Sequence, residues 1–462
     1  MSSDLLLLSA PLQSGKLPGG ICPSLSTLTL GTFLQQKGVA VEVFDPSVQV
    51  ADPSALDAIA EAVLARAPAT IGITALSPVE GRFGAALSKR LKARRPDVPV
   101  VMGGIWAMAR PEQLLTRCPT VDAVVVGPGE RSTLALAEHG LSRPWDVPGL
   151  VWRRPDGGFD SVAPDHEAPP GAPLALDLLA QPEAYDIFCW LTSRGCPFDC
   201  GFCTERLGSP TFVDDPPAKI CADLASLQRV ASKCYLWVCD PLFGANRRRL
   251  AEICDSMEPT GLKFLAESRV DVLDPADVPR MAAAGCNLIY FGLESASHPS
   301  LVALGKLDAR PARFKRYIEG AFALVEACLE NDILPVMGVL NPVPGDTPAE
   351  LAETLEVCRR LAALGSKPGR ELAPYFHAFA LRLDPGAPFE RDLDRFAAAG
   401  AIWSTPPDML FSDRFLVRAS ASIGPDEGEG FRASIKALNP TSPRVLQRLF
   451  RSFPRPYVET DA

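Results

Sequence analysis

The first 140 residues alternate between short apolar segments and segments with helical spacing. This alternation restricts the fold more than any other feature of the chain. Apolar strands that alternate with helices form a parallel sheet with helices on both faces. We therefore predict a doubly wound, Rossmann-like α/β domain over residues 1–141. Its expected strands are residues 4–11, 39–44, 70–75, 99–102 and 123–126.

The carboxyl ends of these strands carry small residues and glycines. A doubly wound sheet binds its ligand at this edge, and glycine lets the backbone come close to a ligand. The same glycines would also suit plain strand-to-helix turns, so the pattern alone leaves both interpretations open. No Gly-x-Gly-x-x-Gly follows the first strand, which argues against a dinucleotide. The candidate ligand contacts are Pro11, Leu76, Ser77, Gly103, Gly104, Gly127, Gly129 and Glu130.

A second strand–helix series follows a stretch rich in Pro, Gly and Asp. Six parallel strands suit a partial (β/α)6 barrel of TIM type, with its active site at the carboxyl ends of the strands. We place a linker with one hairpin at residues 142–185 and the barrel at residues 186–395. The expected barrel strands are residues 188–193, 233–240, 263–269, 287–295, 334–340 and 375–381.

The strand–helix pattern weakens after residue 395, where we expect a small C-terminal helical extension over residues 396–462. Residues 397–403 and 442–453 have helical character. The Gly-rich, acidic segment 424–430 is expected to be a break between these two helices.

Three of the thirteen cysteines, Cys196, Cys200 and Cys203, stand within eight residues of one another in a Gly/Pro loop after the first barrel strand. Three thiolates bind three irons of a [4Fe–4S] cluster and leave the fourth iron open. A zinc site would need a fourth ligand, and the nearby Cys189 lies inside the preceding strand. The other ten cysteines are dispersed, which is typical of core filling.

The stretch Arg194-Gly-Cys-Pro-Phe-Asp-Cys-Gly-Phe-Cys203 is similar to the signature of the radical SAM superfamily. The resemblance implies that the open iron binds S-adenosylmethionine (SAM), which one electron cleaves to a 5′-deoxyadenosyl radical. It also implies that Phe202 helps to hold the adenine and that a flavodoxin- or ferredoxin-type protein supplies the electron.

Several polar residues at the carboxyl ends of the expected barrel strands fit the needs of SAM. A zwitterionic ligand with a ribose needs a cation for its carboxylate and acceptors for its amine and hydroxyls. Salt bridges inside the barrel mouth are the alternative role for these side chains. The candidates are Glu267, Arg269, Glu294 and Ser295. On the last strand, Tyr375 and His377 are weak candidates for catalysis and are equally explained as hydrogen-bonded barrel residues.

The segments Val100-Val-Met-Gly-Gly104 and Asp122-Ala-Val-Val-Val-Gly-Pro-Gly-Glu130 resemble the cobalamin-binding domain that precedes many radical SAM barrels. Pro128 departs from the family, which has an acidic residue there. None of the four histidines stands in an Asp-x-His-x-x-Gly motif. The resemblance therefore implies cobalamin without a histidine ligand, its lower face next to the loop at Leu76 and Ser77.

Together these features predict a cobalamin-dependent radical SAM enzyme that methylates an unactivated carbon of a small molecule or peptide. A non-methylating enzyme of the same architecture, catalysing cyclisation, ring contraction or oxidation, is the alternative, and an iron–sulfur or corrinoid sensor is a third. The net charge of −9 argues against nucleic acid as a partner. The start Met-Ser-Ser-Asp has no basic region and no apolar segment is long enough to span a bilayer, so we expect a cytoplasmic protein without membrane contact.

Overall fold

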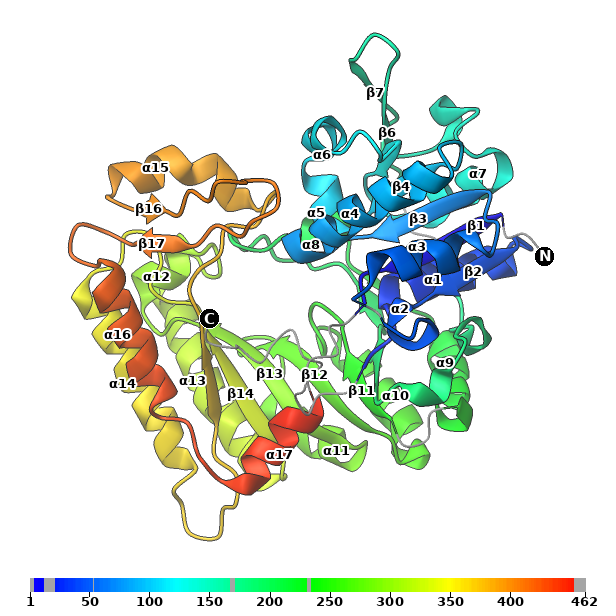
Figure 1. The fold of residues 1–462 in the computed structure, drawn as a ribbon. Helices are drawn as coiled ribbons and strands as arrows, with labels where there is room; N and C mark the ends of the chain where they lie inside the picture. Colours follow the sequence, from blue (N-terminus) through cyan, green and yellow to red (C-terminus); the bar gives the residue numbers. More distant parts are fainter. Residues whose placement is uncertain (1–3, 12–20, 53, 167–170, 231–233, 453–462) are drawn as a thin grey trace.

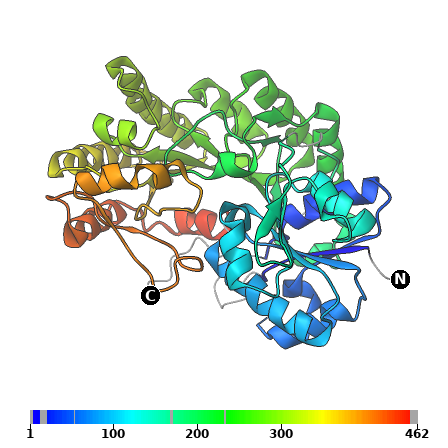
Figure 2. The same ribbon diagram turned by 90° about the horizontal axis from the view of Figure 1, so that it is seen from above.

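The computed structural model describes residues 4–11, 21–52, 54–166, 171–230 and 234–452. Two α/β units, each built on its own sheet, lie side by side, and the C-terminal segments pack along the second unit (Figures 1 and 2). Among the described helices, none combines the length and the apolar character that a membrane crossing requires.

The first unit is built on a seven-stranded sheet in the order β2-β1-β3-β4-β5-β6-β7. The strands β1 to β5 are parallel, as predicted, and they are Leu5–Ser9, Val41–Phe44, Thr70–Thr74, Val100–Gly103 and Ala123–Val125. The helices of this unit are α1 (Leu25–Gln36), α2 (Pro46–Gln49), α3 (Leu56–Leu64), α4 (Pro78–Arg94), α5 (Ile105–Ala109), α6 (Pro111–Arg117) and α7 (Glu130–His139).

Both faces of this sheet are covered, because successive side chains of β1 point to opposite sides. Leu6 and Leu8 join a core with residues of α3 and α4. Leu5 and Leu7 pack with residues of α1 and α7 on the other face. The all-leucine strand is therefore the centre of a three-layer unit, as its uninterrupted apolar sequence indicates.

The hairpin expected within the linker belongs to the first sheet. Strand β6 (Leu150–Arg153) pairs antiparallel with β5, and β7 (Phe159–Ser161) pairs with β6. The sheet therefore continues past residue 141 to Ser161, because the hairpin covers the otherwise exposed edge of β5. The remaining link to the barrel starts beyond this hairpin.

The second unit contains six parallel strands in the order β15-β14-β13-β12-β11-β8, which confirms the predicted partial barrel. Lys233, the expected first residue of its second strand, lies outside the described residues. The strands are β8 (Ile187–Trp190), β11 (Tyr235–Val238), β12 (Lys263–Arg269), β13 (Cys286–Glu294), β14 (Leu334–Val339) and β15 (Tyr375–Ala378). The helices are α9 (Pro217–Val230), α10 (Arg247–Met257), α11 (Val278–Ala283), α12 (His298–Ala303), α13 (Pro311–Glu330) and α14 (Pro348–Leu364).

Two expectations for the C-terminal extension were wrong. The segment expected to be a break is part of α16 (Pro425–Lys436), whose side chains Phe431 and Ile435 are buried one helical turn apart. The first helical stretch is α15 (Leu393–Ala398), and the chain then forms β16 (Ile402–Trp403), which pairs with β17 (Leu416–Arg418). In both places packing against the barrel outweighs local composition.

The last helix, α17 (Pro443–Ser452), matches the second helical stretch within the described residues, and Phe453 lies outside them. The segment between β8 and α9 contains one short helix, α8 (Glu205–Gly208), and two short strands that pair antiparallel, β9 (Ser193–Arg194) and β10 (Val213–Asp214).

Candidate active site

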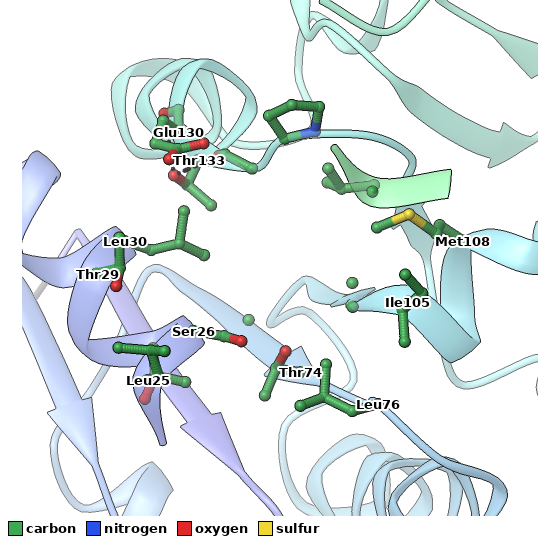
Figure 3. A pocket seen from close by; sticks show the side chains of 18 of the residues that line it. Leu25, Ser26, Thr29, Leu30, Thr74, Leu76, Ile105, Met108, Glu130 and Thr133 are labelled. Carbon is green, nitrogen blue, oxygen red and sulfur yellow. Dashed lines mark hydrogen bonds between the residues drawn. The ribbon is translucent and has the colours of Figure 1, made fainter. Parts of the chain in front are cut away.

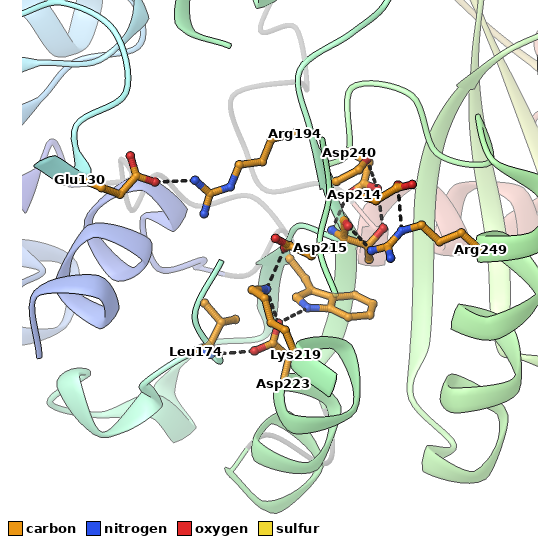
Figure 4. A network of polar contacts seen from close by, with 12 residues as sticks. Glu130, Leu174, Arg194, Asp214, Asp215, Lys219, Asp223, Asp240 and Arg249 are labelled. Atoms are coloured by element: carbon orange, nitrogen blue, oxygen red, sulfur yellow. Dashed lines mark hydrogen bonds and ion pairs between the residues drawn. The ribbon is translucent and has the colours of Figure 1, made fainter. Parts of the chain in front are cut away.

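The loop that carries the three clustered cysteines starts directly after β9, and two buried side chains fix the backbone before it. Asp240, at the end of β11, accepts hydrogen bonds from the Thr192 amide at 2.6 Å and the Ser193 hydroxyl at 2.7 Å. Arg249 donates to the Thr192 carbonyl (Figure 4). Both the amide and the carbonyl of Thr192 are thus hydrogen-bonded, which fixes the chain just before the cysteine loop.

Cys196, Cys200 and Cys203 follow within this loop, and all thirteen cysteines have free thiols. Burial raises the pKa of the Cys200 thiol, while the charges of Lys306 and Arg269 lower it. Among the described residues, no three His, Cys, Asp or Glu side chains converge as they would on one metal ion. Each thiolate of a [4Fe–4S] site binds a different iron, so such convergence is not required there.

Arg269, at the end of β12, lies against this loop. Its guanidinium carbon is 3.8 Å from the centre of the Phe198 ring, and its Nη1 donates to Cys200 Sγ at 3.4 Å. The same guanidinium donates to both carboxylate oxygens of Asp271, at 2.9 and 3.0 Å, and to the Lys306 carbonyl at 2.9 Å. Arg269 therefore reaches the cysteine loop with most of its donors already in use.

Glu294 and Lys306 form a buried ion pair beside the cysteine loop, with Nζ 2.8 Å from Oε1. The backbone of Glu294 has φ of +59°, a conformation that costs a residue with a side chain about 1–3 kcal/mol and is often kept at functional sites. Lys306 was not predicted as a site residue, because its neighbours in the sequence do not distinguish it from a surface lysine.

Ser295 does not share this environment, contrary to the expectation that it contacts SAM. Its side chain is fully buried, and its hydroxyl hydrogen-bonds with the Thr354 hydroxyl of α14 at 3.0 Å. It also accepts from the Ser297 amide. The Ser295 hydroxyl thus holds the chain just after β13 against α14.

Glu267 lies deeper on the inner face of the barrel sheet. Its Oε1 accepts a hydrogen bond from the Trp237 indole nitrogen at 3.0 Å. Burial raises the pKa of Glu267 to about 7. The site therefore contains a carboxyl group that changes charge near neutral pH, which is typical of functional positions.

An aromatic pair lies beside Glu267, because the register of the sheet sets Glu267 opposite Tyr290. The Tyr290 hydroxyl is 3.5 Å from Nδ1 of His377, and the two rings meet edge to face. A β-carbon at Gly338, on the strand between them, would lie 2.6 Å from the Tyr290 oxygen. Gly338 thus makes room for this contact. Tyr375 is level with Tyr290 in the register and half-buried.

A cavity of about 360 Å³ lies at the edge of the first sheet, and its wall is mainly apolar (Figure 3). Residues of α1 and α5 face each other across it. Of the candidate cobalamin contacts, Pro11 and Ser77 do not line it, and Ser77 instead caps the N-terminus of α4. The predicted contacts that line it are Leu76, Gly103, Gly104, Gly127, Gly129 and Glu130.

The adjacent glycines of this cavity have different roles. A β-carbon at Gly104, whose φ is +94°, would lie 2.4 Å from the Ala75 carbonyl oxygen, so the fold itself requires glycine there. A β-carbon at Gly103 would have its nearest neighbour at 3.9 Å. Gly103 therefore leaves its backbone open toward the cavity, which suits the close approach of a large planar ligand.

The barrel closes the other side of the same cavity. The structure adds lining residues that the sequence analysis did not select, because only the packing of the two units brings them together. Histidine is not among the described residues that line the cavity. The main additions are Ser26, Thr29, Leu30, Ile105 and Met108 from the first unit and Leu191, Arg194, Glu205 and Cys239 from the second.

Comparisons with known proteins agree with this geometry. A family model described as B12 binding domain matches residues 17–137, and one described as Radical SAM superfamily matches residues 190–358. The chain therefore contains a radical SAM domain. More particularly, this domain follows a B12-binding domain. This confirms the predicted two-domain fold and the predicted cofactors, a [4Fe–4S] cluster, SAM and cobalamin.

Relatives with curated names are distant. The chain is 27% identical to an uncharacterized methyltransferase, PH0819, of Pyrococcus horikoshii, over 65% of this chain and 68% of that protein. It is 24% identical to the anaerobic magnesium-protoporphyrin IX monomethyl ester cyclase of Rubrivivax gelatinosus, over 66% of this chain and 56% of that protein.

A solved structure with the same fold is the radical SAM methyltransferase TsrM from Kitasatospora setae. It has a TM-score of 0.72 and 18% identity, and the match covers 95% of this chain and 89% of that one. Two of these three proteins are named as methyltransferases, the predicted activity, and the third is named as a cyclase.

Proposed function

We propose that the protein methylates a carbon atom of a small molecule or peptide that is not activated for ionic chemistry. The cavity between the two units carries this proposal, because its wall combines the glycine turns of the B12-binding domain with the segment of the cysteine loop. A substrate at this junction can reach both cofactors, and holding reactants together is a large part of catalysis.

The bound groups would supply a transferable methyl group, on cobalamin, and a hydrogen-abstracting radical, from SAM at the cluster. The chain's own residues bind and orient these groups. Cys196, Cys200 and Cys203 hold the cluster. The proposed contacts of SAM are Phe202, Glu267, Arg269 and Glu294. The proposed contacts of cobalamin are Leu76, Gly103, Gly104, Gly127, Gly129 and Glu130.

Other residues shape the surroundings of the reaction. Leucine side chains of β1 and α1 exclude water from the cavity wall, where water would compete with the bound groups. His377 and Tyr375 remain the candidates for contact with the substrate from the last strand. We also propose a flavodoxin- or ferredoxin-type electron donor. The free cysteines suit a reducing compartment such as the cytoplasm.

The proposal is tested by anaerobic reconstitution with iron, sulfide and cobalamin, followed by incubation with SAM, a reductant and a panel of small molecules and peptides. The expected product carries one additional CH2 unit, and 5′-deoxyadenosine forms with it. The similarity to a cyclase supports one alternative, a non-methylating reaction. A product without an added carbon, formed together with 5′-deoxyadenosine, would establish that alternative and refute methylation.

A further inference from the structure

Residues 405–414, between β16 and β17, form a loop that projects from the rest of the C-terminal extension. At its neck, the Ser404 amide donates to the Phe415 carbonyl at 2.8 Å, and the Phe415 amide donates to the Ser404 hydroxyl at 2.9 Å. The Leu383 amide, just after β15, donates to the Arg414 carbonyl at 2.8 Å. The loop is therefore rooted on the barrel, and we name residues 405–414 the clasp.

The tip of the clasp packs on the B12-binding unit. The Leu410 carbonyl accepts a hydrogen bond from the Trp106 indole nitrogen at 3.2 Å, and the rings of Phe411 and Trp106 are 5.4 Å apart. Leu410 is only 8% exposed and belongs to the core of the first sheet, although it is more than 300 residues from Trp106. Arg117 adds a surface ion pair with Asp408 at 3.0 Å.

Trp106 belongs to α5, a five-residue helix that faces the cavity on one side and the clasp on the other. Ile105 and Met108 line the cavity between the units (Figure 3). Trp106, between them in sequence, faces the clasp and lies against α4, where a β-carbon at Gly81 would be 2.3 Å from its ring. A helix this short is unstable alone and takes its position from its packing.

We propose that Leu410 and Phe411 are positioning residues: the clasp holds α5 in place as a wall of the cobalamin cavity. This inference rests on the proposed function only in naming cobalamin as the ligand. It assigns a role to the C-terminal extension, none of whose described residues lines the cavity. The position of one cofactor would thus depend on a segment attached to the other unit.

The test compares the double variant Leu410→Ala/Phe411→Ala with the matched control Phe415→Ala, whose side chain is 42% exposed at the clasp neck. Hydroxocobalamin binding is titrated by its absorbance. The double variant should bind at least about tenfold more weakly, because the packing of one buried and one half-buried apolar side chain is lost. Its iron content after reconstitution should equal that of the wild type. The control should match the wild type in both measurements.

A second readout needs no cofactor. Hydrogen exchange of peptides that cover residues 104–110 should be faster in the apo double variant than in the apo control, and barrel peptides should be unchanged. The single variant Phe411→Tyr keeps the aromatic ring, so its residues 104–110 should exchange as slowly as those of the control. If the wild type binds no cobalamin, the proposed function fails while this exchange difference still tests the clasp. Unchanged exchange over residues 104–110 would overturn the inference, as would unchanged cobalamin affinity in a binding-competent protein.

If the double variant does not fold, Trp106→Phe removes the hydrogen bond to Leu410 and replaces the indole, which packs against Gly81 and Phe411, with a smaller ring. This variant should also bind cobalamin more weakly and exchange faster over residues 104–110, but by less than the double variant. Wild-type exchange and affinity in this variant and in Phe411→Ala would likewise overturn the inference.

Discussion

Arg194 and Glu130 form an ion pair that joins the two units of the protein (Figure 4). Arg194 stands two residues before the first clustered cysteine, and Glu130 begins α7 after the glycine turn of the B12-binding unit. Their side chains are only 16% and 7% exposed, and both residues line the cavity. The pair therefore connects the cysteine loop directly to the wall of the cavity between the units.

Breaking this pair should destabilise the contact between the units. Removing one partner leaves the other charge poorly solvated, so Glu130→Gln and Arg194→Met should each lower the free energy of unfolding by about 1–3 kcal/mol. The double variant should lose less than the sum, because the pair is lost only once. Denaturant unfolding of the four proteins measures this. Strictly additive losses would show that the two charges do not interact.

Gly103→Leu should block cobalamin binding without unfolding the protein. The backbone there accepts a side chain, and that side chain would occupy the cavity. Gly104→Ala should instead lower stability, since its β-carbon would meet the Ala75 carbonyl. Cobalamin titration and thermal unfolding of both variants separate the two effects. Normal cobalamin affinity in Gly103→Leu would place the cofactor elsewhere.

Replacement of Cys196, Cys200 or Cys203 by Ala should abolish the cluster and the cleavage of SAM. The wild type should take up about four irons and four sulfides. Cys189→Ala is the matched control, because its Sγ lies 3.3 Å from Cys22 Sγ, in a separate thiol contact. Iron and sulfide analysis and the yield of 5′-deoxyadenosine measure the result. Full activity in any triplet variant would contradict the assignment.

The stability of the protein should fall as pH rises from about 5 to 8, in part because of Glu267. Burial raises the pKa of Glu267 to about 7, so the folded state keeps a proton that the unfolded state has lost. Glu267→Gln should remove this dependence and gain roughly 1–3 kcal/mol on the wild type between pH 5 and 8. Parallel unfolding curves at several pH values measure it. An equal slope for both proteins would show that Glu267 is ionised throughout.

Gly338→Ala should impair turnover while sparing the cluster. The added methyl group would overlap the Tyr290 hydroxyl and push it away from His377. If this pair orients the substrate, product formation should fall by roughly tenfold or more, with unchanged iron content and unchanged cleavage of SAM in the absence of substrate. Unaltered turnover would show that the contact between Tyr290 and His377 does not orient the substrate.

Local patterns in the sequence were sufficient for the parallel strands of both sheets. The run Leu5 to Leu8 predicts a strand buried on both faces, and the six apolar segments predict the partial barrel, because such periodicity follows from backbone geometry. The cysteine spacing predicts a cluster site from local sequence too, because its three proposed ligands lie on one short loop. The hairpin at residues 150–161 was predicted correctly, but its pairing with β5 was not, and helix α16 was wrongly predicted as a break. Both take their stability from the surfaces they cover.

The sequence by itself determined the two-domain architecture and the glycine turns at the edge of the first sheet, and it predicts the cluster ligands. Only the tertiary structure decided which residues share a cavity, that Ser295 is a packing residue, and that Lys306 pairs with Glu294. It also brought Leu410 of the clasp onto Trp106. These contacts join residues far apart in the chain, and no local pattern encodes them, because their energy arises only when separate units pack together.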